Sequence, residues 1–467
     1  MKLLLPVKNF LKAIVLLVPL SLSCTTENKS DYNVLFICID DLNDWTDFLG
    51  GHPGAITPNM DNLANQSFIF EKAYCPAPAC NPSRAAIMTG IRPSTSGVYI
   101  NPQDWRENEV LKNVPTLPQY FKNNGYMVMG SGKTFHDRFP DPNSWGEYWP
   151  AKNKQRPDDP MPVGRPLNGI EKTHFDWGPV DVSKEQMGDW QVADWVISKL
   201  KQDYEKPFFL ACGFYRPHLP WYVPQEYFDK FPLDQIQLPV VVEDDINDLP
   251  LTAKDFIRFK DHEAVITHNQ WKNAVQGYLA SINFVDECVG RVIDQLQKSK
   301  YRDNTIVVLW SDHGWHLGEK EHWRKFALWE NTTRTVFLMQ IPKNNKQGKS
   351  IGDPVSLLDI YPTLVDLCNL PENDKLEGNS LAPLFSATDY NWENPAITTH
   401  QRNNHTIRFG QWRYIQYNDG SEELYDHDKD PHEWHNLAEN PKYDSIKNRM
   451  IKWIPEKNAK SMVQIKK

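Results

Sequence analysis

A cysteine stands directly before a short sequence that can begin a helix, in the run Cys80-Asn81-Pro82-Ser83-Arg84. Proline and serine favour the first positions of helices. The free backbone N–H groups at a helix start carry partial positive charge and stabilise an anion, and Arg84 adds a fixed positive charge. Taken alone, the same residues also fit a turn with a small buried cysteine. The pattern indicates a site where an anion meets residue 80.

Acidic residues follow two apolar runs elsewhere in the chain. They are Asp40 and Asp41 after residues 33–39, and Asp312 with His313 after residues 305–310. Carboxylate oxygens are hard donors of the kind that calcium binds. Alone, the first pair also fits a helix cap or a solvated turn, and the second fits a capped loop. Their shared place after apolar runs predicts that they meet.

Apolar runs of strand length alternate with segments of helical periodicity. The expected strands are residues 33–39, 126–129, 207–214, 305–310 and 336–341, and the expected helices include residues 272–298 and 355–368. This alternation predicts an α/β fold with a large mixed, mostly parallel sheet covered by helices on both faces. Ligands of such sheets gather outside the carboxyl ends of the strands. Asp40, Asp41, His218, Asp312 and His313 are all expected there.

The chain changes character after about residue 390. Short strand-like runs at residues 406–407 and 412–417 surround Gly410 and Gly420, which predicts a small antiparallel sheet. We therefore expect a catalytic domain over residues 30–388 and a smaller C-terminal domain over residues 389–467. The proline-rich stretch 140–179 is expected to form long surface loops.

The N-terminus has the pattern of an export signal. Three lysines precede an apolar run at residues 13–22 that is too short to span a bilayer. Residues 21–24 resemble a bacterial lipoprotein cleavage site, although Ser21 replaces the usual aliphatic residue. We expect a signal peptide over residues 1–23, a lipid on Cys24, and a periplasmic or cell-surface protein. Ordinary secretion without a lipid is the alternative.

Charge and cysteine content narrow the function classes. The formal net charge of -9 gives no general attraction for nucleic acid, so an anionic substrate needs a local cluster of cations. The seven cysteines are widely spaced and include no CxxC pair. Neither a disulfide framework nor a zinc ribbon is indicated. Cysteines other than Cys24 and Cys80 are expected to be paired or buried.

Residues 80–90 match every fixed position of the pattern C-x-P-S-R-x-x-x-x-T-G. The chain thus resembles the type I sulfatases, which have an alkaline-phosphatase-like fold. The resemblance implies that a formylglycine-generating or anaerobic sulfatase-maturating enzyme oxidises Cys80 to formylglycine. One hydroxyl of the hydrated aldehyde then attacks sulfur, and the second drives the release of sulfate.

Further residues match the family in chain order. The resemblance implies a calcium ion bound by Asp40, Asp41, residue 80, Asp312 and His313. It also implies a catalytic set of Arg84, Lys133, His136, His218 and Lys325 around residue 80. Within that set, Lys133 and His136 hold the formylglycine hydroxyls, His218 protonates the leaving group, and Lys325 binds sulfate oxygens.

The segments DDLNDW, GKTFH and RPHLPW are similar to those of iduronate-2-sulfatase-like members, and choline-sulfatase-like members share the His316–Glu319 run in part. This likeness implies a sulfated, uronate-containing polysaccharide or its oligosaccharides, of the glycosaminoglycan or ulvan type. Arg216, His322, Arg324 and Arg402 are candidates for recognising a carboxylate or a second sulfate. The alternatives are a phosphoesterase or phosphonate hydrolase of the alkaline-phosphatase superfamily, and a non-catalytic glycan-binding lipoprotein. The cysteine motif argues against the first alternative, and the complete polar set argues against the second.

Overall fold

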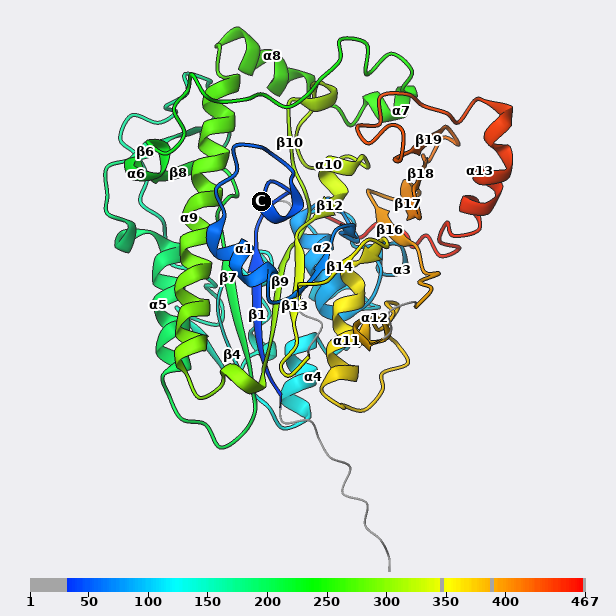
Figure 1. The fold of residues 1–467 in the computed structure, drawn as a ribbon. Coiled ribbons are helices and arrows are strands. Elements are labelled where there is room, and N and C mark those ends of the chain that lie inside the picture. Colours follow the sequence, from blue (N-terminus) through cyan, green and yellow to red (C-terminus); the bar gives the residue numbers. More distant parts are fainter. Residues whose placement is uncertain (1–31, 345–347, 387–389, 465–467) are drawn as a thin grey trace, which may run out of the picture.

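The computed structural model describes residues 32–344, 348–386 and 390–464. Its centre is an eight-stranded sheet (Figure 1). In spatial order the strands are β14 (Ser350–Ile351), β2 (Phe68–Phe70), β13 (Phe337–Gln340), β9 (Thr305–Ser311), β1 (Asn33–Ile39), β7 (Phe208–Phe214), β4 (Met127–Gly132) and β5 (Glu147–Trp149). The run from β9 to β5 is parallel, and β13 pairs antiparallel with both β9 and β2.

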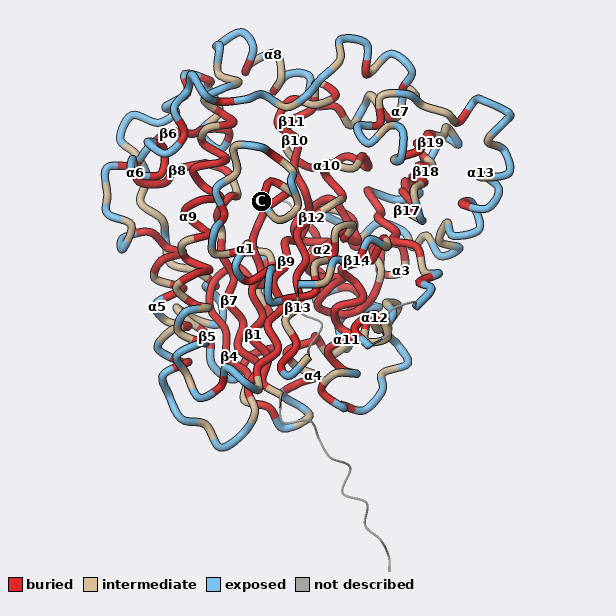
Figure 2. Tube along the Cα trace, in the orientation of Figure 1, coloured by how far each residue is buried: buried red, intermediate tan, exposed pale blue. Residues whose placement is uncertain are grey.

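Both faces of this sheet are buried, as Figure 2 shows for the central strands. In β1, Leu35 and Ile37 belong to one hydrophobic cluster, and Phe36 and Cys38 belong to another on the opposite face. The first cluster contains residues of α9 (Trp271–Lys298), α5 (Gly188–Leu200) and α1 (Pro58–Ala64). The second contains residues of α2 (Cys80–Thr89), α4 (Leu117–Asn123) and α11 (Ile360–Leu367). The prediction of a mostly parallel sheet covered on both faces is confirmed.

Short elements complete this part of the chain. The helices are α3 (Pro93–Ser96), α6 (Gln225–Phe228), α7 (Leu251–Lys254), α8 (Phe259–Thr267), α10 (Glu330–Thr333) and α12 (Ala382–Ser386). The strands are β3 (Ala73–Tyr74), β6 (Trp177–Val180), β8 (Trp221–Pro224), β10 (His316–Leu317), β11 (Trp323–Arg324), β12 (Arg334–Thr335) and β15 (Val355–Ser356).

A separate antiparallel sheet forms the C-terminal part (Figure 1, orange to red). It consists of β16 (Ala396–Thr399), β17 (His405–Phe409), β18 (Trp412–Gln416) and β19 (Glu422–Asp426), followed by α13 (Asp444–Ile451). Side chains of β18 and β19 pack against Ala327, Leu328 and Trp329. The segment that follows Lys325 is therefore held against this sheet.

Two expectations about local structure need correction. The helix expected over residues 355–368 begins only at Ile360, because Val355 and Ser356 pair with β3 and the side chain of Ser356 caps a 3₁₀ turn at Leu357–Asp359. The stretch 140–179 is mostly loop, but Glu147–Trp149 pairs with β4 as the edge strand of the main sheet. An edge strand of three residues carries too short an apolar pattern to be recognised in the sequence.

The cysteines in the described residues are buried and do not form disulfides. They are Cys38, Cys75, Cys80, Cys212, Cys288 and Cys368. Cys24 and the expected signal peptide 1–23 lie outside the described residues. None of the described helices is long and apolar enough to cross a membrane.

Candidate active site

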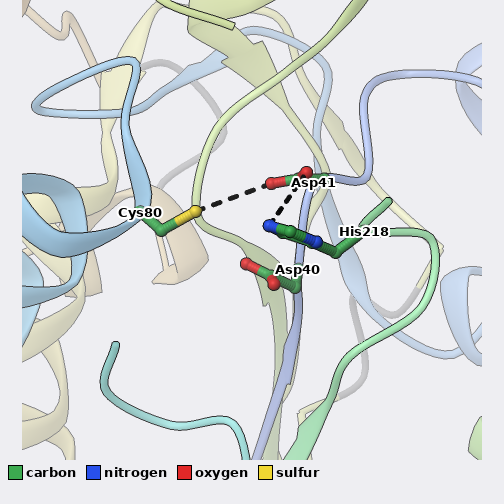
Figure 3. Close-up of side chains that lie close together, drawn as sticks. All are labelled: Asp40, Asp41, Cys80 and His218. Carbon is green, nitrogen blue, oxygen red and sulfur yellow. Dashed lines mark hydrogen bonds and ion pairs between the residues drawn. The ribbon is translucent and has the colours of Figure 1, made fainter. Parts of the chain in front are cut away.

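The polar residues expected at strand ends do meet. Asp40 and Asp41 follow β1, Asp312 follows β9, and Lys133 follows β4. Because these strands are parallel neighbours, their carboxyl ends lie at one edge of the sheet. The start of α2 brings Cys80 to the same edge. Figure 3 shows Asp40, Asp41, Cys80 and His218 facing one another.

Cys80 lies at the centre of the cluster and is 1% exposed. Its Sγ is 3.1 Å from Lys325 Nζ, 3.3 Å from His313 Nε2 and 3.7 Å from Asp41 Oδ1. Burial raises the pKa of the Cys80 thiol well above its usual range, although Lys325 acts in the opposite direction. A protonated thiol is a poor nucleophile. The unmodified side chain is therefore unsuited to attack, even in this cationic surrounding.

Arg84 is fully buried and committed to acceptors of the protein itself. Its Nε lies 2.8 Å from Asp312 Oδ2, and its Nη2 lies 3.1 Å from Asp40 Oδ1. Its Nη1 donates to the carbonyl oxygens of Lys133 and Thr134, at 2.5 and 3.1 Å. Arg84 thus joins the ends of β1, β9 and β4. It contributes to the site by positioning Asp40, Asp312 and the backbone of Lys133.

Two lysines place positive charge beside the aspartates. Lys133 Nζ forms an ion pair with Asp40 Oδ2, and Lys325 Nζ lies 2.6 Å from Asp41 Oδ1. Burial disfavours a charge on Asp40, but the positive charges of Lys133 and Arg84 outweigh it and hold the pKa of Asp40 well below its usual range. Asp40 is consequently ionised in the folded protein.

The backbone at Asp41 adopts a left-handed conformation, with φ of 60°. Such a conformation is unusual for a residue with a side chain and persists where the surroundings fix it. The Tyr278 hydroxyl donates to Asp41 O at 2.7 Å and accepts from Asn43 N at 3.0 Å. Asp312 Oδ1 accepts from Asp41 N at 3.1 Å. Tyr278 lies inside α9 at an ordinary core position, so no pattern in the sequence predicts this role.

The cluster has the donors that a hard cation needs. Asp41 Oδ2 is buried and has no hydrogen-bond partner among the described residues. His313 Nδ1 lies 3.0 Å from Gly314 O and must donate to it, which turns the Nε2 lone pair toward the cluster. Ligand atoms of Asp41, Cys80, Asp312 and His313 all lie within 4.8 Å of one another. These residues fit a metal ion.

His218 belongs to the cluster, whereas His136 lies beside it. His218 Nδ1 donates to Leu219 O at 2.5 Å, and its Nε2 lies 3.8 Å from Asp41 Oδ2. Burial, Lys133 and Lys325 hold the pKa of His218 well below its usual range. His136 is half-buried, and its Nδ1 accepts from Arg138 N at 3.4 Å. Within the described residues, no hydrogen bond or ion pair joins His136 to residue 80.

Comparison with known proteins assigns the family. Residues 32–370 match the family model described as "Sulfatase", and residues 318–460 match that of "N-sulphoglucosamine sulphohydrolase, C-terminal". The chain belongs to the sulfatase family. It is a hydrolase of sulfate esters, as the resemblance predicted.

Relatives extend over most of this sulfatase. It is 42% identical to a "Sulfatase" of Formosa agariphila over 94% of this chain and 90% of that protein. It is 30% identical to the mouse "Iduronate 2-sulfatase" over 73% of this chain and 69% of that protein. A solved phosphonate monoester hydrolase of Agrobacterium radiobacter covers 90% of this chain and 94% of its own, with a TM-score of 0.73 at 21% identity. That likeness shows the shared fold alone.

The residues expected to recognise a second anionic group of the substrate have different surroundings in this sulfatase. Arg216 is 1% exposed and forms an ion pair with Asp159 at 3.1 Å. His322 is fully buried, and its Nε2 donates to Lys325 O at 3.0 Å. Both side chains support the site from within the protein. Arg324 is partly exposed and Arg402 is exposed, so these two remain open to solvent.

A further group with metal-ligand side chains lies in the C-terminal part. Glu330, His427 and Glu433 have ligand atoms within 4.8 Å of one another. The Arg413 guanidinium forms ion pairs with both glutamates and is fully buried. Arg408 Nε lies 3.7 Å from Glu330 Oε2 as well, so two arginines offset the charge of the two carboxylates, and the group joins α10 to the antiparallel sheet.

Proposed function

We propose that this sulfatase hydrolyses sulfate esters of a uronate-containing polysaccharide or its oligosaccharides, using calcium and a formylglycine at position 80. The observation that carries the proposal is the place of residue 80. It lies 3.1 Å from a buried lysine and 3.3 Å from a histidine, beside a buried carboxylate oxygen that has no hydrogen-bond partner in the part of the chain that the structure describes. Such a site attracts an anion and a cation together.

Calcium is the metal that the donor set favours. Asp40, Asp41, Asp312 and His313 would hold it together with the oxidised residue 80, and most of these donors are carboxylate oxygens. A bound calcium ion supplies positive charge toward the oxygens of the sulfate group. The unpartnered oxygen of Asp41 supports this assignment, because a buried acceptor is costly unless something binds it.

Formylglycine supplies the nucleophilic oxygen that the Cys80 thiol lacks. Its formation requires a formylglycine-generating or anaerobic sulfatase-maturating enzyme as a partner. The raised pKa of the buried thiol supports this requirement, because the unmodified residue stays protonated.

The remaining residues bind and position the sulfate ester. Lys325 places a buried ammonium group 3.1 Å from Sγ of residue 80, and the buried Lys133 ammonium pairs with Asp40 in the same cluster, where negative charge develops as sulfur is attacked. His218 Nδ1 is committed to Leu219 O, so its Nε2 is the atom that faces the cluster. With the single proton of the neutral ring on Nδ1, Nε2 carries a lone pair, so His218 can give a proton to the leaving oxygen only as the imidazolium, which a bound sulfate anion stabilises. His136, three residues after Lys133, stays our candidate for a second partner of the formylglycine hydroxyls.

The iduronate 2-sulfatase among the relatives supports a uronate-containing substrate, of the glycosaminoglycan or ulvan type. We assign catalysis to residues 30–388 and a supporting role to residues 389–467, whose sheet packs on Trp329. Export with a lipid on Cys24 would place the enzyme in the periplasm or at the cell surface, where polymer fragments are accessible. Metabolic labelling with palmitate tests the anchor, since Cys24→Ala would lose the label.

Sulfate release from defined substrates tests the proposed function. The protein is produced with a maturating enzyme and offered a 2-O-sulfated uronate disaccharide, a sulfated neutral disaccharide, 4-nitrophenyl sulfate and a phosphonate monoester. We expect sulfate release that is fastest from the uronate substrate. Hydrolysis of the phosphonate alone would contradict the proposed sulfatase reaction, and preference for the neutral sugar would contradict the substrate class.

A further inference from the structure

The ring of Phe326 is half-exposed and lies near two polar side chains, Arg258 and His400. Phe326 directly follows Lys325, and its N–H donates to the carbonyl oxygen of Pro78 at 3.1 Å, just before residue 80. The Arg258 guanidinium lies 5.1 Å from the centre of its ring. The ring of His400 lies 6.3 Å from it. Segments far apart in the sequence thus meet beside the sulfate site.

Arg258 has an exposed side chain that forms no ion pair within the described part of the chain. Its neighbour Arg324 differs, because Arg324 Nε lies 2.7 Å from Asp261 Oδ2. The backbone of Arg258 is nevertheless fixed relative to the site: its N–H donates to His322 Nδ1 at 3.1 Å, and His322 Nε2 donates to Lys325 O. One imidazole therefore holds the backbone of Arg258 next to the backbone of Lys325.

His400 adds a neutral polar group. It is 3% exposed, and its Nδ1 is buried without a hydrogen-bond partner among the described residues. Burial, and then the nearby Arg258, lower the pKa of His400 to about 3. The imidazole is therefore neutral at physiological pH, with one N–H to donate. An unpartnered buried nitrogen is costly unless a ligand satisfies it.

We propose that Arg258, Phe326 and His400 form a subsite for a second acidic group on the sugar whose sulfate ester reacts. A guanidinium binds a carboxylate or a sulfate through paired hydrogen bonds, and an aromatic face packs against the apolar face of a sugar ring. This inference rests on the proposed function and names the residues that would select its substrate class. Arg216 and His322, the candidates expected from the sequence, are buried. Arg258 takes their place in this proposal, because its side chain is exposed to solvent.

Substrate selectivity of Arg258→Ala tests this subsite. The matched control is Lys260→Ala, which removes the same charge from an exposed position two residues away. Both variants and the parent enzyme are assayed on a 2-O-sulfated uronate, its carboxyl-reduced analogue, a disulfated neutral sugar and 4-nitrophenyl sulfate. For Arg258→Ala we expect kcat/KM to fall about tenfold to a hundredfold on an acidic substrate, mainly through KM. We expect no change on 4-nitrophenyl sulfate, and no change for Lys260→Ala.

The pattern of losses identifies the group that is bound. A loss confined to the uronate assigns the subsite to a carboxylate, and a loss confined to the disulfated sugar assigns it to a second sulfate. Equal losses on 4-nitrophenyl sulfate, or no loss on either acidic substrate, would overturn the subsite while leaving the proposed function intact. A parent enzyme that releases sulfate from none of the substrates would overturn the proposed function itself.

Discussion

Lys325→Ala removes an ammonium group that lies between Asp41 and residue 80. Lys325 Nζ is 2.6 Å from the carboxylate and 3.1 Å from Cys80 Sγ, and its side chain is only 6% exposed. Solvent therefore screens its charge little. Loss of one preorganised charge-stabilising donor lowers kcat by about 10²–10³-fold. We expect a loss of this size in sulfate release under saturating substrate.

A lysine five positions earlier provides the matched control. Lys320 is also buried, with Nζ 2.5 Å from Asp245 Oδ1 and 2.5 Å from Glu433 O. Breaking a buried pair costs about 3–5 kcal/mol of stability, so Lys320→Ala should unfold more readily. Because Lys320 does not contact residue 80, its kcat per folded molecule should match that of the parent. Equal kcat values for both variants, normalised to folded protein by circular dichroism, would show that Lys325 has no special role in sulfate release.

Other perturbations probe the metal, the turn at Asp41 and a buried acid. Calcium at a hundred times its Kd should raise the free energy of unfolding by about 2.7 kcal/mol in the parent and by much less in Asp41→Asn; equal stabilisation of both would argue against these ligands. Tyr278→Phe removes the donor to Asp41 O, so calcium affinity measured by titration calorimetry should fall about tenfold. The control is Tyr227→Phe, which loses a hydrogen bond to Glu287 of α9, the helix that also carries Tyr278. This control should keep the calcium affinity of the parent. If both variants bind calcium like the parent, the turn at Asp41 does not depend on the Tyr278 hydrogen bond. Burial raises the pKa of Asp286 from 3.8 to about 6, so the folded state binds this proton more tightly than the unfolded state, and stability falls as the pH rises between these values. Urea titrations at pH 4 and pH 7 should show that Asp286→Asn abolishes about 2 kcal/mol of this fall, and an unchanged difference would contradict the assignment.

Strand positions were predictable where the apolar run is long and buried on both faces. Residues 33–39 form β1 with the expected bounds, and 305–310 lack only Ser311 of β9. The direction of β13 was not predictable, because an apolar run has the same composition whether its strand is parallel or antiparallel to its neighbour. The polar residues at strand ends meet because parallel strands end at one edge of the sheet.

The segment that carries Lys325 shows why other parts of the site could not be predicted. Lys320, Arg324 and Phe326 all have positive φ values, at 54°, 75° and 81°. None of them is a glycine or an asparagine, so the sequence offers no turn signal there. Contacts with residues distant in the chain fix this conformation. Arg258 lies more than sixty positions before Lys325, and only the folded chain brings the two together through His322.

The mass of the peptide that contains residue 80 tests the central claim most directly. The protein is produced with and without a formylglycine-generating enzyme, digested, and analysed by mass spectrometry alongside sulfate release from the same samples. We expect that an aldehyde replaces the CH₂–SH group and that activity rises in proportion to the modified fraction. Full sulfate release from protein in which every residue 80 is unmodified cysteine would contradict it.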